Sequence, residues 1–243
     1  MAKVIEINCE SCNKLRVDCC KSCFKDVKNN IFKSLSTKEI DLLICEKQHI
    51  LYNPGETIVK QNTSSSTVVC IKEGLAKVYV EYKNGKNVIV RIAKKGDFLT
   101  GGGLFNGSVQ HFSVAALTTV KCCMINTSYL TSLFSENSEF ALGLMRKHTQ
   151  QNNYLLNKLV DHTQKYMPGR VADTLLYLSD EIFQSDVFKI PLSRIELAEM
   201  SNMTKESFVR ILQQFKESKI IHAEGHKVTI TDKSSLIEIS ENG

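Results

Sequence analysis

Hydrophobic and polar positions change their period along the chain. Residues 1–30 show little apolar periodicity, whereas residues 48–126 contain short runs rich in Val, Ile, Tyr and Phe between Gly-containing turns. Runs such as LAKVYVEY and NVIVRIA alternate apolar and polar residues as antiparallel strands do, and Asn84-Gly85 between them is typical of a hairpin. Several short strands with regular turns predict a β-sandwich or a rolled antiparallel barrel.

From about residue 128 to residue 163 the period becomes helical. A narrow stripe at three- and four-residue steps predicts a long helix that pairs with the same helix of a second copy. The alternative is that the helix packs on the protein's own β-domain. The polar residues in the middle of the stripe would weaken a dimer relative to an all-aliphatic seam. The predicted dimer seam consists of Phe140, Leu144, His148, Gln151, Leu155 and Leu159, and the stripe continues to His162.

Residues 191–221 (PLSRIELAEMSNMTKESFVRILQQFKESKII) predict two short helices around a tight turn, because their apolar spacings would seal two crossed helices together. Asn202 falls where the turn needs a left-handed residue, and the hydroxyl of Thr204 can cap the second helix. Two short strands joined through Gly225 follow and predict a wing. This pattern is typical of a helix-turn-helix, whose second helix enters the DNA major groove. The alternative is an ordinary αα-hairpin.

Together these patterns predict an α+β protein with an antiparallel β-roll, a long helix and a winged helix-turn-helix. Pro168-Gly169 predicts a hinge after the long helix, and a further helix is expected over residues 170–183. The expected domains are a Cys-rich arm (1–30), a β-roll sensor domain (31–127), a dimerisation helix (128–164) and a winged helix-turn-helix DNA-binding domain (165–243).

Composition is that of a globular protein, with 42% hydrophobic and 23% charged residues. The chain has no apolar run near the roughly 18 residues that span a bilayer, and no signal peptide, so we expect a cytoplasmic protein. The net charge of +5 suits an anionic partner, but residues 165–243 hold 10 Lys and Arg against 12 Asp and Glu. DNA binding would therefore depend on local placement of cations. We expect no enzyme, because the sequence has no Walker-type loop, HExxH motif or Ser/His/Asp ordering.

Nine cysteines are many for a reducing compartment, where a disulfide framework is not expected. Clustered thiolates are soft ligands for zinc, iron–sulfur clusters or Cu(I). Cys9-x2-Cys12-x7-Cys20-x2-Cys23 would be a complete four-thiolate set for tetrahedral zinc. The other cysteines include Cys19, the adjacent Cys122 and Cys123, and Cys45 and Cys70, whose apolar surroundings predict small core residues.

The order of β-roll, long helix and winged helix-turn-helix resembles the Crp/Fnr family of bacterial transcription regulators. The most specific matches are MTKESFVRIL, the glycines of NPGE, KEG and KKGDF, and GLF at 103–105, and the resemblance covers nearly the whole chain. It implies a cyclic-nucleotide-binding-like roll that senses a signal. It also implies a homodimer that binds a two-fold symmetric operator in double-stranded DNA, with RNA polymerase as a partner.

In that family a Glu and an Arg at this spacing recognise the G·C pairs of a TGA-containing half-site, and Glu206 and Arg210 match those positions. Arg can donate two hydrogen bonds to guanine, and Glu can accept one from cytosine. Val209 could touch a thymine methyl group. The alternative is an exposed Glu–Arg pair that adds only about 0.3–0.5 kcal/mol to the helix. The candidate phosphate contacts are Thr204, Lys205 and Ser207.

The chain is most similar to the oxygen-sensing Fnr branch of the family, which holds a [4Fe–4S] cluster with three arm cysteines and one cysteine of a late roll strand. Cys9, Cys12 and Cys123 match that pattern, and the third arm ligand is left open among Cys19, Cys20 and Cys23. The resemblance implies that oxygen, nitric oxide or redox state controls DNA binding. Zinc in the arm or a thiol–disulfide sensor are the alternatives. We do not expect cAMP to bind, because Gly101 replaces the family's ribose-binding Glu and no Arg occurs between Arg91 and Arg146.

Overall fold

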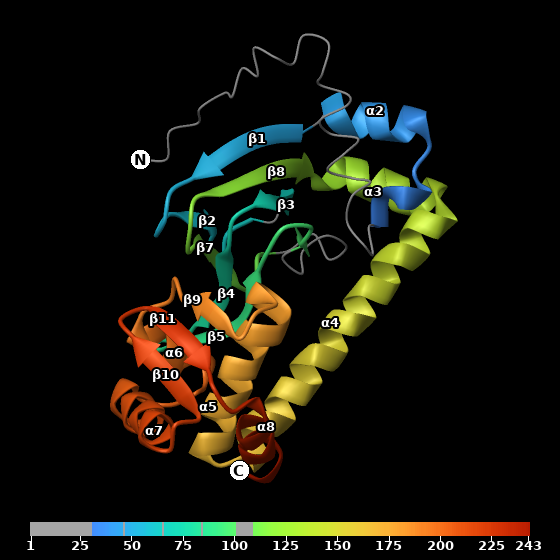
Figure 1. Cartoon of the computed structure of the whole chain (residues 1–243). Coiled ribbons are helices and arrows are strands. Elements are labelled where there is room, and N and C mark those ends of the chain that lie inside the picture. The colour runs from blue at the N-terminus through green and yellow to red at the C-terminus, as the bar shows by residue number, and fades with distance from the viewer. Residues whose placement is uncertain (1–30, 46, 65, 84, 101–108) are drawn as a thin grey trace. The chain divides into compact units, whose positions relative to one another are not determined.

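The computed structural model describes residues 31–45, 47–64, 66–83, 85–100 and 109–243 (Figure 1). They form two compact units. The first comprises the described residues up to Val80 together with Ala93–Asn152, and the second comprises Glu81–Ile92 and Asn153–Gly243. Across these ranges no helix combines the length and the apolar character needed to cross a membrane. The predictions for Cys9, Cys12, Cys19, Cys20, Cys23, Asn84 and Gly101 lie outside the described residues.

The predicted β-roll is present as two four-stranded sheets, with strand orders β1-β8-β3-β6 and β2-β7-β4-β5. All the strand pairs whose register is defined are antiparallel, as the alternating sequence pattern predicts. The strands of the first sheet are β1 (Lys47–Tyr52), β8 (Val120–Asn126), β3 (Thr67–Glu73) and β6 (Phe98–Leu99). Those of the second are β2 (Thr57–Val59), β7 (Ser113–Ala116), β4 (Ala76–Glu81) and β5 (Asn87–Ala93).

The sheet β1-β8-β3-β6 is apolar on both faces, because two cores lie against it. Val69 and Ile71 of β3 and Cys122 of β8 point into the core of the roll. Their neighbours Val68 and Ile125 point the other way, into a second core that we call the helix-covered core. It is closed by η1 (Ile31–Ser34), α2 (Thr37–Cys45), α3 (Thr127–Glu136) and the start of α4 (Ser138–Gln164).

The helical stretch from residue 128 is two helices rather than the single one predicted. Asn137 separates α3 from α4 and has extended backbone angles. Its Oδ1 accepts a hydrogen bond from the backbone N–H of Phe140 at 2.9 Å, and its Nδ2 donates to Ser34 O and Glu39 Oε1. Asn137 therefore caps α4 and ties it to the preceding helices, as Asn does well at a helix start. Periodicity could not reveal this break, because both helices continue the apolar pattern.

The predicted dimer seam is wrong for Phe140 and Leu144. These side chains are 0% and 1% exposed and belong to the helix-covered core, so they have no surface to offer a second copy. The alternative prediction, packing on the protein's own β-domain, holds for this part of α4. Further along, Leu155 and Leu159 are exposed and remain candidates for a dimer contact, whereas His148 and Gln151 are only half exposed.

A different row of α4 residues forms a continuous exposed surface along the helix. Its members recur at alternating three- and four-residue steps, as the a and d positions of a coiled coil do. They lie on the side of the helix opposite Phe140 and Leu144. We call this row the α4 seam, and it consists of Leu142, Met145, Thr149, Asn152, Leu156, Leu159 and Thr163, all exposed.

The last 77 residues form the predicted winged helix-turn-helix with two additions. Its helices are α5 (Met167–Leu176), the π-helix η2 (Tyr177–Phe183), α6 (Arg194–Met200), α7 (Lys205–Glu217) and α8 (Lys233–Asn242). The wing strands β10 (Ile221–Glu224) and β11 (Lys227–Ile230) pair as predicted, and β9 (Val187–Lys189) extends them to three strands in the order β10-β11-β9. The sequence pattern indicated neither β9 nor α8.

The hinge and the following helix lie slightly earlier than predicted. The helical turns stop at Lys165–Tyr166, and Pro168 lies inside the first turn of α5, where a missing N–H breaks no intrahelical bond. From Tyr177 the helix continues as a π-helix to Phe183. Helical structure is therefore present over residues 170–183, as expected. It begins earlier than predicted, at Met167, and changes from an α-helix to a π-helix at Tyr177.

Three side chains of the second unit bind the backbone of β5, the edge strand of its sheet. Tyr154 Oη donates to Val90 O at 3.3 Å, and Lys158 Nζ donates to Ile89 O at 3.1 Å and to Val90 O at 2.7 Å. Tyr177 Oη accepts from Ile92 N at 3.1 Å and donates to Ile92 O at 3.4 Å. We call Tyr154, Lys158 and Tyr177 the β5 clasp. It satisfies backbone groups that an open sheet edge would leave unpaired.

Candidate nucleic-acid interface and cysteine site

Helix α7 has one buried face that fixes which side chains remain outside. Phe208, Ile211, Leu212 and Phe215 are buried, and helices α6 and α7 pack together. The N-terminus of α7 is capped by Thr204, whose Oγ1 accepts from Ser207 N at 3.2 Å. Thr204 also donates to the hydroxyl of Ser207 at 3.2 Å. These two hydroxyls therefore order the first turn, the part of a recognition helix that meets the bases.

The opposite face of α7 presents a charged and an apolar group together. Lys205, Glu206, Val209 and Arg210 are exposed, and Val209 keeps 41% of its surface accessible. Within the part of the chain that the structure describes, Glu206 and Arg210 form no ion pair with each other or with another side chain. The alternative prediction, a local Glu–Arg pair, is therefore not formed. Both groups are available to a ligand outside the protein.

The turn between α6 and α7 has the geometry predicted for it. Asn202 has a φ of 50°, in the left-handed region, and Met203 N donates to Ala198 O at 3.0 Å. Helix α6 starts with a capping box, in which Ser193 Oγ accepts from Glu196 N and Glu196 Oε2 accepts from Ser193 N. These contacts hold α7 at a defined angle to α6.

Two contacts from α5 fix the same turn and were not predicted. Arg170 Nη1 donates to Asn202 O at 2.9 Å, and the hydroxyls of Thr174 and Ser201 lie 2.8 Å apart inside the core. Their partners are 27 and 32 residues away in sequence, so no local pattern marks them. Through these bonds the helix after the hinge positions the recognition helix.

The wing is held against α6 in a similar way. Gly225 turns the wing with a φ of 56°, and its carbonyl accepts from Arg194 Nη2 at 2.9 Å. His226 Nδ1 lies 3.0 Å from Ile190 O, so this ring has an internal partner. Arg194 is thus a positioning residue for the wing, another role that the sequence did not indicate.

Cys123 lies on β8 between two other residues whose side chains can bind a metal, one on each adjacent strand. It faces His49 of β1 on one side and Cys70 of β3 on the other. Its Sγ is 3.5 Å from His49 Nδ1, and it is 4% exposed. Cys70 is half-buried against the helix-covered core, as predicted for a core residue. His49 was missed, because only the strand register reveals that it stands opposite Cys123.

Cys122 points to the other side of β8, as predicted from strand alternation. It belongs to the core of the roll, and its Sγ donates to Ile50 O at 3.7 Å. Burial, with a smaller effect of Cys123, raises the pKa of its thiol to about 12. A thiol held neutral in this way is a poor metal ligand, because metals bind the thiolate.

The described residues alone do not complete a metal site. Among them, no three His, Cys, Asp or Glu side chains are arranged to hold a metal ion. A soft centre that uses Cys123 would need its other ligands from the arm cysteines. Cys123 fits such a centre in kind, since zinc and iron–sulfur clusters bind thiolates, and an imidazole N–H beside the sulfur stabilises thiolate charge.

Comparison with known families gives two matches in the expected order. A model described as a cyclic nucleotide-binding domain matches residues 49–137, and one described as a Crp-like helix-turn-helix domain matches residues 169–239. Curated relatives include the cAMP-activated global transcriptional regulator Vfr of Pseudomonas aeruginosa, 26% identical over 200 residues, 79% of this chain and 94% of Vfr. The probable transcriptional regulator flp of Lacticaseibacillus casei is 24% identical over 209 residues, 85% of this chain and 93% of flp.

Solved structures share the fold at lower sequence identity. FixK2 from Bradyrhizobium japonicum superposes on this chain with a TM-score of 0.73 at 18% identity. The superposition covers 79% of this chain and 96% of the FixK2 chain. A regulator of the crp/fnr family from Eubacterium rectale gives a TM-score of 0.74 at 15% identity, covering 87% and 98%. The architecture of roll, long helix and helix-turn-helix is therefore common to all three proteins.

Proposed function

The chain belongs to the Crp/Fnr family of DNA-binding transcription regulators, and on that basis we propose that it binds, as a homodimer, a two-fold symmetric operator with TGA-type half-sites. The family follows from the pairing of a cyclic nucleotide-binding domain with a Crp-like helix-turn-helix domain. Its relatives are transcription regulators, not enzymes, as the sequence predicts for this chain.

One observation carries the proposal for DNA recognition: Glu206 and Arg210 stand exposed on one face of α7, and neither has an ion-pair partner among the described residues. A guanidinium that is not neutralised by its neighbour can donate both hydrogen bonds to guanine O6 and N7. Glu206 can accept from the cytosine amino group, and Val209 between them can contact a thymine methyl group. Lys205 begins α7 directly after its cap Thr204, and these two residues, with Ser207 in the first turn, would contact phosphates.

The test is operator binding by fluorescence anisotropy at one fixed salt concentration, with a TGA-type palindrome and a scrambled duplex. Arg210→Ala should lose about 1–3 kcal/mol per half-site, so that binding to the palindrome falls to the level of the scrambled duplex. Lys216→Ala removes an equally exposed cation at the other end of α7 and is the matched control. Full discrimination between the two duplexes by Arg210→Ala would refute the assignment.

The homodimer is supported by the α4 seam. Leu142, Met145, Leu156 and Leu159 are large apolar side chains on one side of α4 and are each more than half exposed. In water an exposed apolar row of this length on a monomer is unfavourable, and pairing with a second copy would bury it. Thr149 and Asn152 place a polar layer in the middle of the row, which favours one register over others.

For the signal, the proposal is an oxygen-, nitric oxide- or redox-sensitive centre that uses Cys123. A [4Fe–4S] cluster would supply reactivity toward oxygen or nitric oxide, and it needs four thiolates. Cys123 would provide one of them from the roll, and Cys9, Cys12 and one of Cys19, Cys20 and Cys23 the others. His49 would then lie against the ligating sulfur, where an N–H donor stabilises thiolate charge. Binding of this kind would tie the arm to β8.

Zinc held by the arm alone, or a thiol redox switch there, is the second candidate. The observation that favours it is that Cys9, Cys12, Cys20 and Cys23 are already four thiols in two C-x2-C pairs. The two centres make different demands on Cys123, because an arm-only zinc site does not use it. In either case the roll could have a separate ligand.

Anaerobic purification with iron, sulfide and zinc assays separates these candidates. The cluster predicts about four irons per chain, a broad band near ~400 nm that bleaches in air, and loss of both in Cys123→Ser. Cys122→Ser is the matched control, since Cys122 faces the core of the roll and should leave the metal content unchanged. If the protein instead holds one zinc per chain, and Cys123→Ser retains it, the cluster proposal is wrong and the arm-only zinc site is supported.

We also propose that the roll does not respond to cAMP, although Vfr and related regulators are cAMP-activated by name. A buried phosphate needs a cation or comparable donors, and the sequence has no Arg from position 92 to 145. Calorimetric titration with cAMP checks this directly, and saturable binding at micromolar concentration would contradict it.

A further inference from the structure

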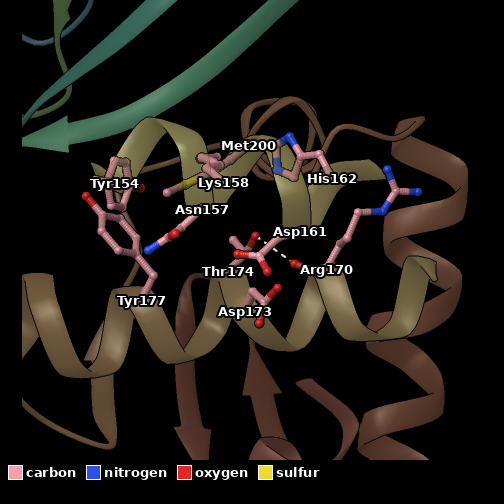
Figure 2. Close-up of a pocket in the computed structure, with 10 residues that line it drawn as sticks. All are labelled: Tyr154, Asn157, Lys158, Asp161, His162, Arg170, Asp173, Thr174, Tyr177 and Met200. Atoms are coloured by element: carbon pink, nitrogen blue, oxygen red, sulfur yellow. Dashed lines mark hydrogen bonds between the residues drawn. The ribbon is translucent and has the colours of Figure 1, made fainter. Parts of the chain in front are cut away.

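The second unit contains a cavity of about 200 Å³ beside the hinge. Its walls come from the last turns of α4, from α5 and the start of η2, and from the end of α6, as Figure 2 shows. These are the elements that set the position of the recognition helix. The residues that decide its chemistry are Lys158, Asp161, His162, Arg170 and Asp173, with Asn157 at its exposed rim.

Both carboxylates of the cavity lie against the ammonium group of Lys165. Asp173 accepts from Lys165 Nζ at 2.9 Å through both oxygens, and also from the hydroxyl of Ser240. Asp161 lies 3.3 Å from the same ammonium group. Lys165 does not line the cavity, but it offsets part of the negative charge there and uses the lone pairs with which a cationic ligand would be bound.

The donors of the cavity, in contrast, are not all used. Lys158 Nζ has three protons, and within the described ranges it donates to the two carbonyls of β5. Arg170 donates from Nη1 to Asn202 O, whereas its Nε is buried without a hydrogen-bond partner in the described structure. A buried N–H normally has an acceptor, and a charged N–H most of all. The two basic side chains of the wall therefore have donors that the described residues do not use.

The pKa shifts of His162 and Lys158 determine the charge on the basic side chains of the cavity. Burial, together with the nearby charges of Lys158 and Arg170, lowers the pKa of His162 to about 4. The ring is neutral at neutral pH, so the charged groups that line the cavity are the cations Lys158 and Arg170 and the carboxylates Asp161 and Asp173, which Lys165 partly neutralises. Burial lowers the pKa of Lys158 to about 8, which still leaves it mostly protonated at pH 7.

We propose that this cavity is a binding site for a compact anion that carries a phosphate or carboxylate group, held by Lys158 and Arg170. Its volume corresponds to roughly six or seven water molecules, which admits inorganic phosphate or a small acid and excludes a dinucleotide. The anion accepts the free protons of Lys158 and Arg170. Arg170 also donates a hydrogen bond to Asn202 O, so anion binding in the cavity is linked to the turn that orients α7. Only this second part rests on the proposed DNA binding.

Binding is measured on the full-length chain without DNA, by following the histidine ring protons in NMR while inorganic phosphate replaces chloride at constant ionic strength. A parallel titration with acetate distinguishes phosphate from carboxylate ligands. We expect saturable shifts of the His162 signals with at least one of the two anions. Absence of saturable shifts with both would overturn the proposal.

Three variants place the site. Asn157→Asp adds a negative charge at the exposed rim without disturbing the core, and should weaken binding at least about 10-fold, as should Lys158→Met. Lys205→Met removes a cation of the DNA-facing surface and should leave the affinity unchanged. Loss of binding in Lys205→Met with full binding in Asn157→Asp would place the anion on the DNA-facing surface and refute the cavity site.

Coupling is tested by operator affinity with and without the anion that binds. We expect a change of at least about 5-fold in the wild-type chain that is absent in Asn157→Asp. If the chain binds no operator at all, the NMR titration still stands, so failure of the proposed function and failure of the anion site give different results.

Discussion

Leu156→Glu tests the α4 seam, because this side chain lies at the centre of the exposed apolar row. Leu156 is 60% exposed in the single chain. Complete burial of a Leu side chain is worth about 1.5–3 kcal/mol, so burial of the exposed part contributes about 1–2 kcal/mol. A two-fold axis doubles each contact, which gives about 2–4 kcal/mol per dimer. The dimer dissociation constant should therefore rise about 30- to 800-fold, and two opposed carboxylates would add to the effect.

The assay is sedimentation equilibrium over a concentration series, with operator binding measured on the same samples. Gln150→Glu introduces the same charge at an exposed position of α4 outside the seam and should leave the constant unchanged. Circular dichroism establishes that both variants keep their helices. If Leu156→Glu dimerises as tightly as the wild-type chain, the pairing surface lies elsewhere and the argument from exposure is wrong.

Other consequences of the structure can be measured separately. Thr204→Ala removes the cap of α7 and should lower the free energy of unfolding by about 1 kcal/mol in denaturant titration, with Thr204→Ser restoring it. Phe208 is fully buried, so Phe208→Ala should cost about 3–5 kcal/mol. For His162 the folded pKa of about 4 lies below the ordinary 6.5, so the unfolded chain binds more protons between these values. Stability should fall in this window as pH decreases, by about 1–2 kcal/mol since the ring is half exposed, and His162→Gln should not show the loss. Lys158 has a folded pKa of about 8 against 10.5, so its burial penalty is present below pH 8 and is relieved as pH rises to 10.5. Relative to Lys158→Met, the wild-type chain should gain up to about 3 kcal/mol across that window, and an absent gain would mean that the ammonium is not desolvated.

The sequence predicted those features that depend on local period and turn chemistry. The alternation in β3 and β8, the left-handed Asn202, the cap at Thr204 and the wing turn at Gly225 all follow from a few neighbouring residues. Each of these was confirmed, because local preference and tertiary packing favour the same conformation there.

Features that depend on distant partners were not predictable in the same way. The stripe of α4 showed that the helix has apolar sides, but period alone does not say whether Phe140 faces the roll or a second copy. Arg170, Arg194 and His49 take their roles from residues many positions away, which become neighbours only after folding. The DNA contacts and the metal ligands remain predictions, since they depend on molecules outside the chain.

The β5 clasp has a consequence for how this protein can change over evolutionary time. The hydrogen bonds of the clasp given above end on main-chain carbonyls and an amide of the strand. Residues 89–92 can therefore be exchanged for others of similar shape without loss of any of these bonds. The three helical positions have no such freedom, since a replacement without a donor at the same reach leaves the strand edge open. Amino-acid substitutions should therefore accumulate in β5 and be selected against at the three helical positions that bind it.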